Sequence, residues 1–118
     1  MLWKEYFIPN SVEEALEILC GYQGRARIMA GGTDLVIQTQ DGTCQADAVV
    51  DITRIPDLNT IALEDGYIIL GATVTHAQAA ASPLIRERAG VLAAACAAVG
   101  SPQIRNVGTV VGNVVNAM

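Results

Sequence analysis

Apolar runs and helical patterns alternate along residues 1–55. Strands are predicted at 6–8, 25–30 and 48–52, because each segment has the length of a strand and contains a short apolar stretch, which in the second is residues 28–30. Helical patterns fill both intervals between these runs. Strands that alternate with helices in this way are typical of a β-α-β layer, in which each helix packs on a shared sheet.

The first helix is predicted from its start signal and from the spacing of its apolar residues. Ser11, with Glu14 three residues later, forms a capping box, and Gly21 marks the end of the pattern. We expect one face of this helix to pack on the sheet. The apolar residues of that face are Val12, Ala15, Leu16, Leu19 and Cys20.

The pattern changes after a boundary that we expect near residues 53–59. Apolar runs at 60–63 and 67–70 flank Asp65-Gly66, a dipeptide that favours a tight hairpin turn. Thr73 or Thr75 can then cap a helix over 77–81. Further helices are predicted at 84–88 and 91–99. After Pro102 the chain runs to a glycine-containing segment at 108–113. The predicted fold class is therefore α/β of the α+β kind, with a β-α-β subdomain at 1–55 and a second α+β subdomain at 56–118.

A glycine-containing corner follows the second predicted strand. Gly31-Gly32 permits backbone angles that a side chain would forbid, and Thr33 or Asp34 can cap the next helix. Several peptide N–H groups then converge on one point, which suits a phosphate. No Gly-Lys-Ser/Thr sequence follows, so a nucleoside triphosphatase loop is excluded. This first corner consists of Ile28, Met29, Ala30, Gly31, Gly32, Thr33, Asp34 and Leu35.

A second segment with the same appearance begins at Gly108. Its residues are Thr109, Val110, Val111, Gly112 and Asn113. Two such corners in one small chain suggest that a diphosphate is held between them. An ordinary tight turn also explains either corner taken separately. Arg105 could reach a phosphate or could brace the preceding loop by hydrogen bonds to carbonyl groups.

Composition narrows the partners that this chain can have. A formal net charge of −5 leaves no basic stripe for nucleic acid or anionic lipid. The longest apolar run, residues 91–99, has about half the ~20 residues that a membrane-spanning helix needs. The N-terminus shows no signal peptide, and this absence predicts a cytoplasmic location. The 3 cysteines lack the spacing of an iron–sulfur site, so such a cluster would belong to another chain. His76, the single histidine, is expected in the first turn of a helix rather than as a base or ligand.

In their context the two corners resemble the paired flavin-binding motifs of the molybdenum hydroxylase family, which includes xanthine dehydrogenase and carbon monoxide dehydrogenase. The first reads Ala-Gly-Gly-Thr-Asp-Leu at 30–35, and the second follows Gln-Ile-Arg-Asn at 103–106. The segments at 51–53, 55–58 and 71–76 also follow the family's order, so the resemblance covers essentially the whole chain. It implies the FAD-binding fold of this family's middle subunit, with the second subdomain incomplete because family members are more than twice as long.

The resemblance also implies a function. Residues 28–35 and 109–113 would line FAD, with Val99 close to the flavin, and no residue of this chain would be catalytic or bind metal. Electrons would pass from iron–sulfur clusters on one partner subunit, reduced by a molybdopterin subunit, through FAD to NAD or another acceptor. The 118-residue chain is expected to be inactive alone, because it would be a fragment, a truncated gene product or one piece of a split subunit. Its unpaired strand edge could bind a second copy or a complementary chain. The alternative is a flavin-free remnant or a subunit-interaction domain.

One position departs from the family's pattern. Val111 stands where the family has the first glycine of its second motif. If this position requires a positive φ, a β-branched side chain would cost about 1–3 kcal/mol or shift the cofactor.

Overall fold

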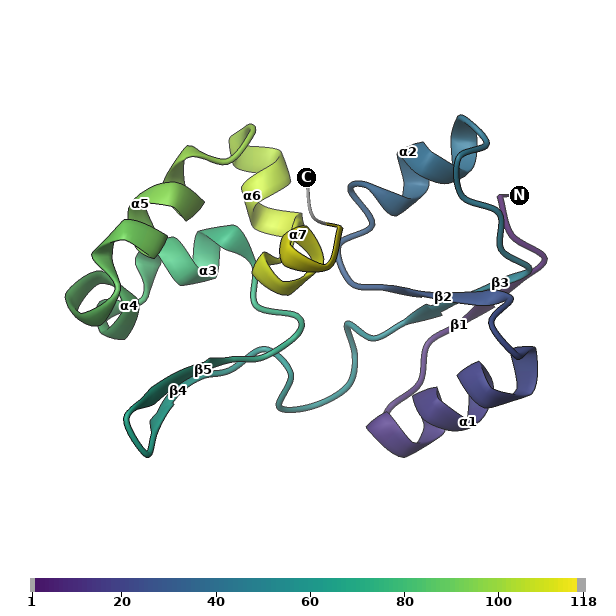
Figure 1. Ribbon diagram of the computed structural model, residues 1–118, viewed down its shortest axis with the longest axis horizontal. Coiled ribbons are helices and arrows are strands. Elements are labelled where there is room, and N and C mark those ends of the chain that lie inside the picture. The colour runs from purple at the N-terminus through teal and green to yellow at the C-terminus, as the bar shows by residue number, and fades with distance from the viewer. Residues whose placement is uncertain (1, 117–118) are drawn as a thin grey trace. The chain divides into compact units, whose positions relative to one another are not determined.

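The structure is a computed structural model that describes residues 2–116 (Figure 1). Its internal contacts divide the chain into two compact units, Met1–Pro56 and Asp57–Met118. The first unit contains a parallel sheet with two helices, and the second contains a β-hairpin followed by short helices. The mixed helix and strand architecture confirms the predicted fold class.

The sheet of the first unit consists of β1 (Glu5–Phe7), β2 (Ala26–Met29) and β3 (Ala48–Asp51), in the order β1-β3-β2 and all parallel. The chain crosses the sheet in one direction between β1 and β2 and returns between β2 and β3. Because such crossovers are right-handed, the two connecting helices fall on opposite faces. Accordingly α1 (Val12–Tyr22) and α2 (Leu35–Gln40) lie on opposite sides of the strands (Figure 1). The central strand β3 is covered on both faces, and its first three residues, 48–50, are fully buried.

The start of α1 has the predicted capping box. The Ser11 Oγ atom accepts a hydrogen bond from the backbone N–H of Glu14 at 3.1 Å, and the Glu14 carboxylate accepts one from the backbone N–H of Asn10 at 2.9 Å. The helix continues past Gly21 to Tyr22 and ends where Gln23 adopts a left-handed backbone with φ 50°.

The prediction that a continuous apolar face of α1 packs on the sheet is wrong at several of its positions. Ala15 is buried, but Val12 is 44% and Leu16 58% exposed, and Cys20 is also exposed. An α-helix of 11 residues is about 16 Å long, whereas strands of 3 or 4 residues span only about 10–13 Å. The sheet is therefore too short to cover the whole face.

The second unit begins with the predicted hairpin. Strands β4 (Ile61–Glu64) and β5 (Tyr67–Leu70) pair antiparallel, with Glu64 opposite Tyr67. Asp65 and Gly66 both have positive φ angles, 50° and 81°, as a two-residue type I′ turn requires.

Short helices complete the second unit: α3 (His76–Ala81), α4 (Pro83–Arg88), α5 (Gly90–Ala98), α6 (Pro102–Val107) and α7 (Val110–Asn116). Thr75, rather than Thr73, caps α3, since its hydroxyl accepts from the backbone N–H of Gln78 at 3.1 Å. Helices α3, α4 and α5 pack together around a core of buried residues, and α3 also contacts α6. The core consists of Val74, Ala79, Ile85, Ala93 and Cys96.

Helix α6 is absent from the sequence prediction, in which the chain runs directly from Pro102 to the second corner. The structure shows that Ser101 caps this helix, with its hydroxyl 3.2 Å from the backbone nitrogen of Ile104, and that Pro102 occupies the first helical position. The same Ser-Pro pair, Ser82 and Pro83, starts α4. A Ser-Pro start signal was therefore present in the sequence at both helices.

Candidate functional site

The first corner forms at the carboxyl end of β2. Met29 is the last residue of that strand and lies opposite Asp51 of β3, and its carbonyl accepts a hydrogen bond from the Ile52 N–H at 3.0 Å. The chain then bends at Ala30 and Gly31, and Gly32 adopts a φ of +75° before α2 begins at Leu35. Ligands of open α/β sheets bind at this end of the strands.

Backbone donors in the corner are free of intrachain partners. Within the part of the chain that the structure describes, the N–H groups of Gly31, Gly32, Thr33 and Asp34 donate no hydrogen bond, whereas the Gly32 carbonyl accepts one from Val36 N–H at 3.0 Å. All of residues 31–34 are partly buried. A run of consecutive unpaired N–H groups in such a place is a binding site for an anion or for several waters.

The expectation that Thr33 or Asp34 caps the following helix is wrong. Asp34 stands at the capping position of α2, but its φ and ψ angles of −96° and −42° are helical, and its side chain makes no capping hydrogen bond. A capping side chain needs an extended backbone to reach back to the first N–H groups. The Asp34 side chain therefore occupies none of the N–H groups at the start of α2, although that of Val36 donates to the Gly32 carbonyl.

Gly32 has a second reason to be glycine besides its backbone angle. A Cβ atom at this position would lie 2.8 Å from Met29 Sδ and 3.6 Å from Val36 Cγ2. The Met29 side chain thus supports the corner from behind, and any side chain at residue 32 would push against it. Ile28 is 56% exposed, and the remaining residues of the segment, Met29 to Leu35, are partly buried.

The second predicted corner is a helix start, so the expectation of a similar backbone corner is wrong. Thr109 forms an isolated antiparallel bridge with Thr75, and α7 begins at the next residue. The Thr109 hydroxyl accepts from the Gly112 N–H at 3.0 Å, and a Cβ atom on Gly112 would lie 2.6 Å from that hydroxyl. Gly112 therefore permits a tight first turn of a helix, without a positive φ. Asn113 belongs to the same turn, because its N–H donates to the Thr109 carbonyl at 3.1 Å.

The cost expected for Val111 does not arise. Val110 and Val111 are both helical residues of α7, and Val111 is not among the residues with a positive φ. A β-branched side chain is compatible with a helical backbone at a cost of only a few tenths of a kcal/mol.

Val99 and Arg105 are linked in the second unit. Val99 follows the last residue of α5, and the Arg105 guanidinium donates to the carbonyls of Val99 and Gly100 at 3.0 and 3.3 Å. The sequence left two roles open for Arg105, contact with a phosphate or hydrogen bonds to carbonyl groups of the preceding loop. The structure shows the hydrogen bonds to the loop. The first-corner residues thus come together in the first unit, and Val99 and residues 109–113 lie in the second.

Sequence reasoning missed a polar network that adjoins the first corner. The Tyr6 hydroxyl donates to Asp51 Oδ2 at 2.6 Å, and Asp51 Oδ1 accepts from the Thr53 hydroxyl and backbone N–H at 2.6 and 2.9 Å. Burial, followed by the hydrogen bond and the charge of Asp51, raises the pKa of Tyr6 to about 12. The signal in the sequence was the position of Asp51 at the carboxyl end of a buried strand.

The ionisation of Asp51 predicts a pH dependence of stability. Partial burial raises the pKa of this carboxyl, but hydrogen bonds from Thr53 and Tyr6 outweigh burial, and the net pKa lies below its ordinary value. The stabilising effect is therefore complete above the unfolded pKa of about 3.9 and is lost as the pH falls toward the folded pKa. We expect the melting temperature of the wild type to exceed that of Asp51→Asn at pH 6, and the gap to narrow progressively as the pH falls below about 3.9. A gap independent of pH would contradict this assignment.

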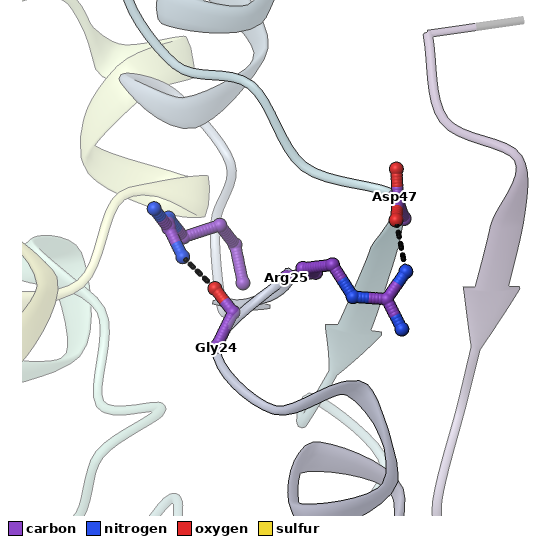
Figure 2. A network of polar contacts seen from close by, with 4 residues as sticks. Gly24, Arg25 and Asp47 are labelled. Carbon is purple, nitrogen blue, oxygen red and sulfur yellow. Dashed lines mark hydrogen bonds and ion pairs between the residues drawn. The ribbon is translucent and has the colours of Figure 1, made fainter.

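An ion pair lies at the opposite end of the same strands. Arg25, just before β2, contacts the carboxylate of Asp47, just before β3, with an N–O distance of 2.5 Å (Figure 2). The Arg25 guanidinium also lies 5.6 Å from the ring centroid of Tyr22. The pair is solvent-exposed, so its contribution to stability is modest, and it supplies a control remote from the corner.

Other kinds of site are not found in residues 2–116. This part of the chain contains no group of three or more His, Cys, Asp or Glu residues that could hold a metal ion. His76 is the first residue of α3, is buried, and has its pKa lowered by burial. None of the described helices has the length and apolar character needed to cross a membrane.

Comparison with known proteins identifies the class to which this fold and corner belong. The family model described as the FAD-binding domain in molybdopterin dehydrogenase matches residues 3–118. The chain belongs to this family, and the family and the cofactor predicted from the sequence, FAD, are both confirmed.

Particular relatives are similar over nearly all of this chain. It is 43% identical over 110 residues to the nicotinate dehydrogenase FAD-subunit of Eubacterium barkeri, covering 92% of this chain and 37% of that protein. It is 34% identical to the carbon monoxide dehydrogenase medium chain of Hydrogenophaga pseudoflava, covering 93% and 38%. A structure of carbon monoxide dehydrogenase from that organism superposes with a TM-score of 0.90 at 33% identity, covering 95% and 39%. The chain thus spans about two fifths of the length of these relatives.

Proposed function

We propose that this chain is the FAD-binding part of an oxidoreductase subunit of the molybdenum hydroxylase type. The observation that carries the proposal is the first corner, where the N–H groups of Gly31, Gly32, Thr33 and Asp34 have no hydrogen-bond partner among residues 2–116. The family to which the chain belongs is an FAD-binding domain family of molybdopterin dehydrogenases, and several relatives are named as FAD subunits of dehydrogenases. Both findings support the proposal.

The corner fits the diphosphate of FAD in both shape and charge. Gly31 and Gly32 carry no side chain that would keep a phosphate from the backbone, and each free N–H can donate to a phosphate oxygen. Lysine is not needed, because peptide dipoles supply the complementary charge. In this proposal residues 28–35 hold the diphosphate and the ribityl chain.

The second unit is proposed to supply a further part of the binding surface. Its residues are Val99, Thr109, Val110, Val111, Gly112 and Asn113. The helical start at Thr109 places the backbone of these residues differently from the predicted corner, and the proposal for them is supported by the family match, which extends to residue 118. Residues 1–55 and 56–118 would then be the two FAD-binding subdomains.

The redox chemistry would come from the cofactor. When bound, FAD supplies one-electron and hydride chemistry, and the protein contributes binding and orientation. We propose that electrons arrive from iron–sulfur clusters on a partner subunit of a complex that also contains a molybdopterin subunit, and leave to NAD or another acceptor. The names "medium chain" and "FAD subunit" among the relatives support membership in such a complex. A cytoplasmic location, self-association and inactivity of the isolated chain stay predictions.

Titration of the purified chain with FAD tests the proposal. We expect saturable quenching of flavin fluorescence, one FAD per chain, and a visible flavin absorbance that survives gel filtration. A folded circular dichroism spectrum without flavin binding at high added FAD would contradict the proposal and favour a flavin-free interaction domain.

A further inference from the structure

The polar network around Asp51 adjoins the glycine corner through the backbone. Asp51 is the register partner of Met29, the last residue of β2 before the corner. The next residue, Ile52, donates its N–H to the Met29 carbonyl at 3.0 Å. The position of the segment 51–53 therefore determines where the start of the corner lies.

Both carboxylate oxygens of Asp51 are occupied, one from each side. Tyr6, on β1, donates to Oδ2 across the sheet, and Thr53 donates to Oδ1 from the segment that leaves β3. Hydrogen bonds to an ionised carboxylate are among the stronger ones in proteins. Together they join β1, β3 and the segment after β3 at the carboxyl edge of the sheet, beside the end of β2.

The same contacts have an electrostatic effect. An ionised carboxylate near a phosphate site would repel the ligand, and donors that surround it reduce this repulsion. The hydroxyls of Tyr6 and Thr53 point their positive hydrogens at Asp51, so they partly offset its charge.

We propose that Tyr6 and Thr53 are positioning residues, which act through Asp51 to hold the glycine corner in the geometry that binds the FAD diphosphate. This inference rests on the proposed function. It assigns to side chains outside the corner the task of keeping the segments around Gly31 and Gly32 in place.

Tyr6→Phe is the principal test, with Thr53→Val as a second variant and Arg25→Gln as the matched control. Tyr6→Phe and Thr53→Val each remove a hydrogen bond to the Asp51 carboxylate, and Arg25→Gln removes the ion pair with Asp47 at the far end of β2 and β3. We expect Tyr6→Phe and Thr53→Val to weaken FAD binding by about tenfold, the effect of one charge-assisted hydrogen bond. Arg25→Gln should leave the affinity unchanged within about twofold.

Amide hydrogen exchange without FAD separates this inference from the proposed function. The reporters are the N–H groups of Ile52 and Val36, which donate to the carbonyls of Met29 and Gly32. We expect both to lose about tenfold of their protection in Tyr6→Phe and to keep it in Arg25→Gln. Equal protection in Tyr6→Phe and Arg25→Gln would overturn the inference whether or not the wild type binds FAD. Failure of the wild type to bind FAD, with the protection changes present, would overturn the proposed function and, with it, the link to the diphosphate.

Discussion

Gly32→Ala is expected to weaken FAD binding by at least tenfold. The φ of +75° at this residue disfavours any side chain, by about 1–2 kcal/mol for alanine. The added Cβ would also lie 2.8 Å from Met29 Sδ, so the backbone or the Met29 side chain must move. Because the ligand is held by backbone N–H groups, a shift of the backbone changes the binding site itself. Fluorescence titration with FAD measures the loss.

Gly42→Ala is the control for Gly32→Ala. Gly42 has a φ of +81° but nothing within 4 Å of an added Cβ, and it follows α2 rather than preceding it. The backbone strain is therefore similar at both positions, and only Gly32→Ala adds the close contact with Met29. Only Gly32→Ala should lose affinity. Equal affinities for the two variants would remove the glycine corner from the binding site.

The second large effect is expected on stability. Gly71→Ala should lower the free energy of unfolding by about 3 kcal/mol, at the upper end of the range for overpacking. An added Cβ would lie 2.0 Å from the backbone oxygen of Leu58, which accepts the Thr73 N–H at 2.9 Å, while the Gly71 N–H donates to the Thr60 carbonyl at 2.9 Å. Relief of the clash would require breaking these backbone hydrogen bonds. Urea unfolding followed by circular dichroism measures the change.

Gly90→Ala provides the comparison in the same unit. Gly90 is the first residue of α5 and has no atom within 4 Å of an added Cβ. Alanine has the higher helix propensity, so a gain of up to about 1 kcal/mol is expected. If Gly71→Ala were as stable as Gly90→Ala, the close approach at Leu58 would be wrong.

Local patterns predicted most elements of the fold. The capping box at Ser11, the Asp65-Gly66 turn and the apolar run of β3 each depend on residues close in sequence, and each appears in the structure. The helix at 102–107 carried a Ser-Pro start signal that the prediction did not use, and the glycines at 108 and 112 suggested a corner where α7 begins. Glycine is compatible with both a turn and a crowded helix start, so its presence alone does not decide between them.

The candidate site was predicted only in part. The corner at 28–35 was located from its glycines and from the strand before it, and the family resemblance that these residues carry is confirmed. The helix cap at Thr33 or Asp34 was wrong, and the role of Tyr6 could not be seen. Tyr6 and Asp51 are 45 residues apart and meet only because β1 lies beside β3.

The sequence by itself determined the order of strands and helices through most of the chain, the glycine corner and the family. These properties depend on short-range patterns and on motifs that need no knowledge of neighbours in space. Only the tertiary structure decided which N–H groups of the corner remain unpaired, which carboxylate is held beside it, and that residues 109–113 start a helix. Hydrogen-bond satisfaction and backbone conformation at such positions depend on the segments that folding brings together, and no local pattern specifies those.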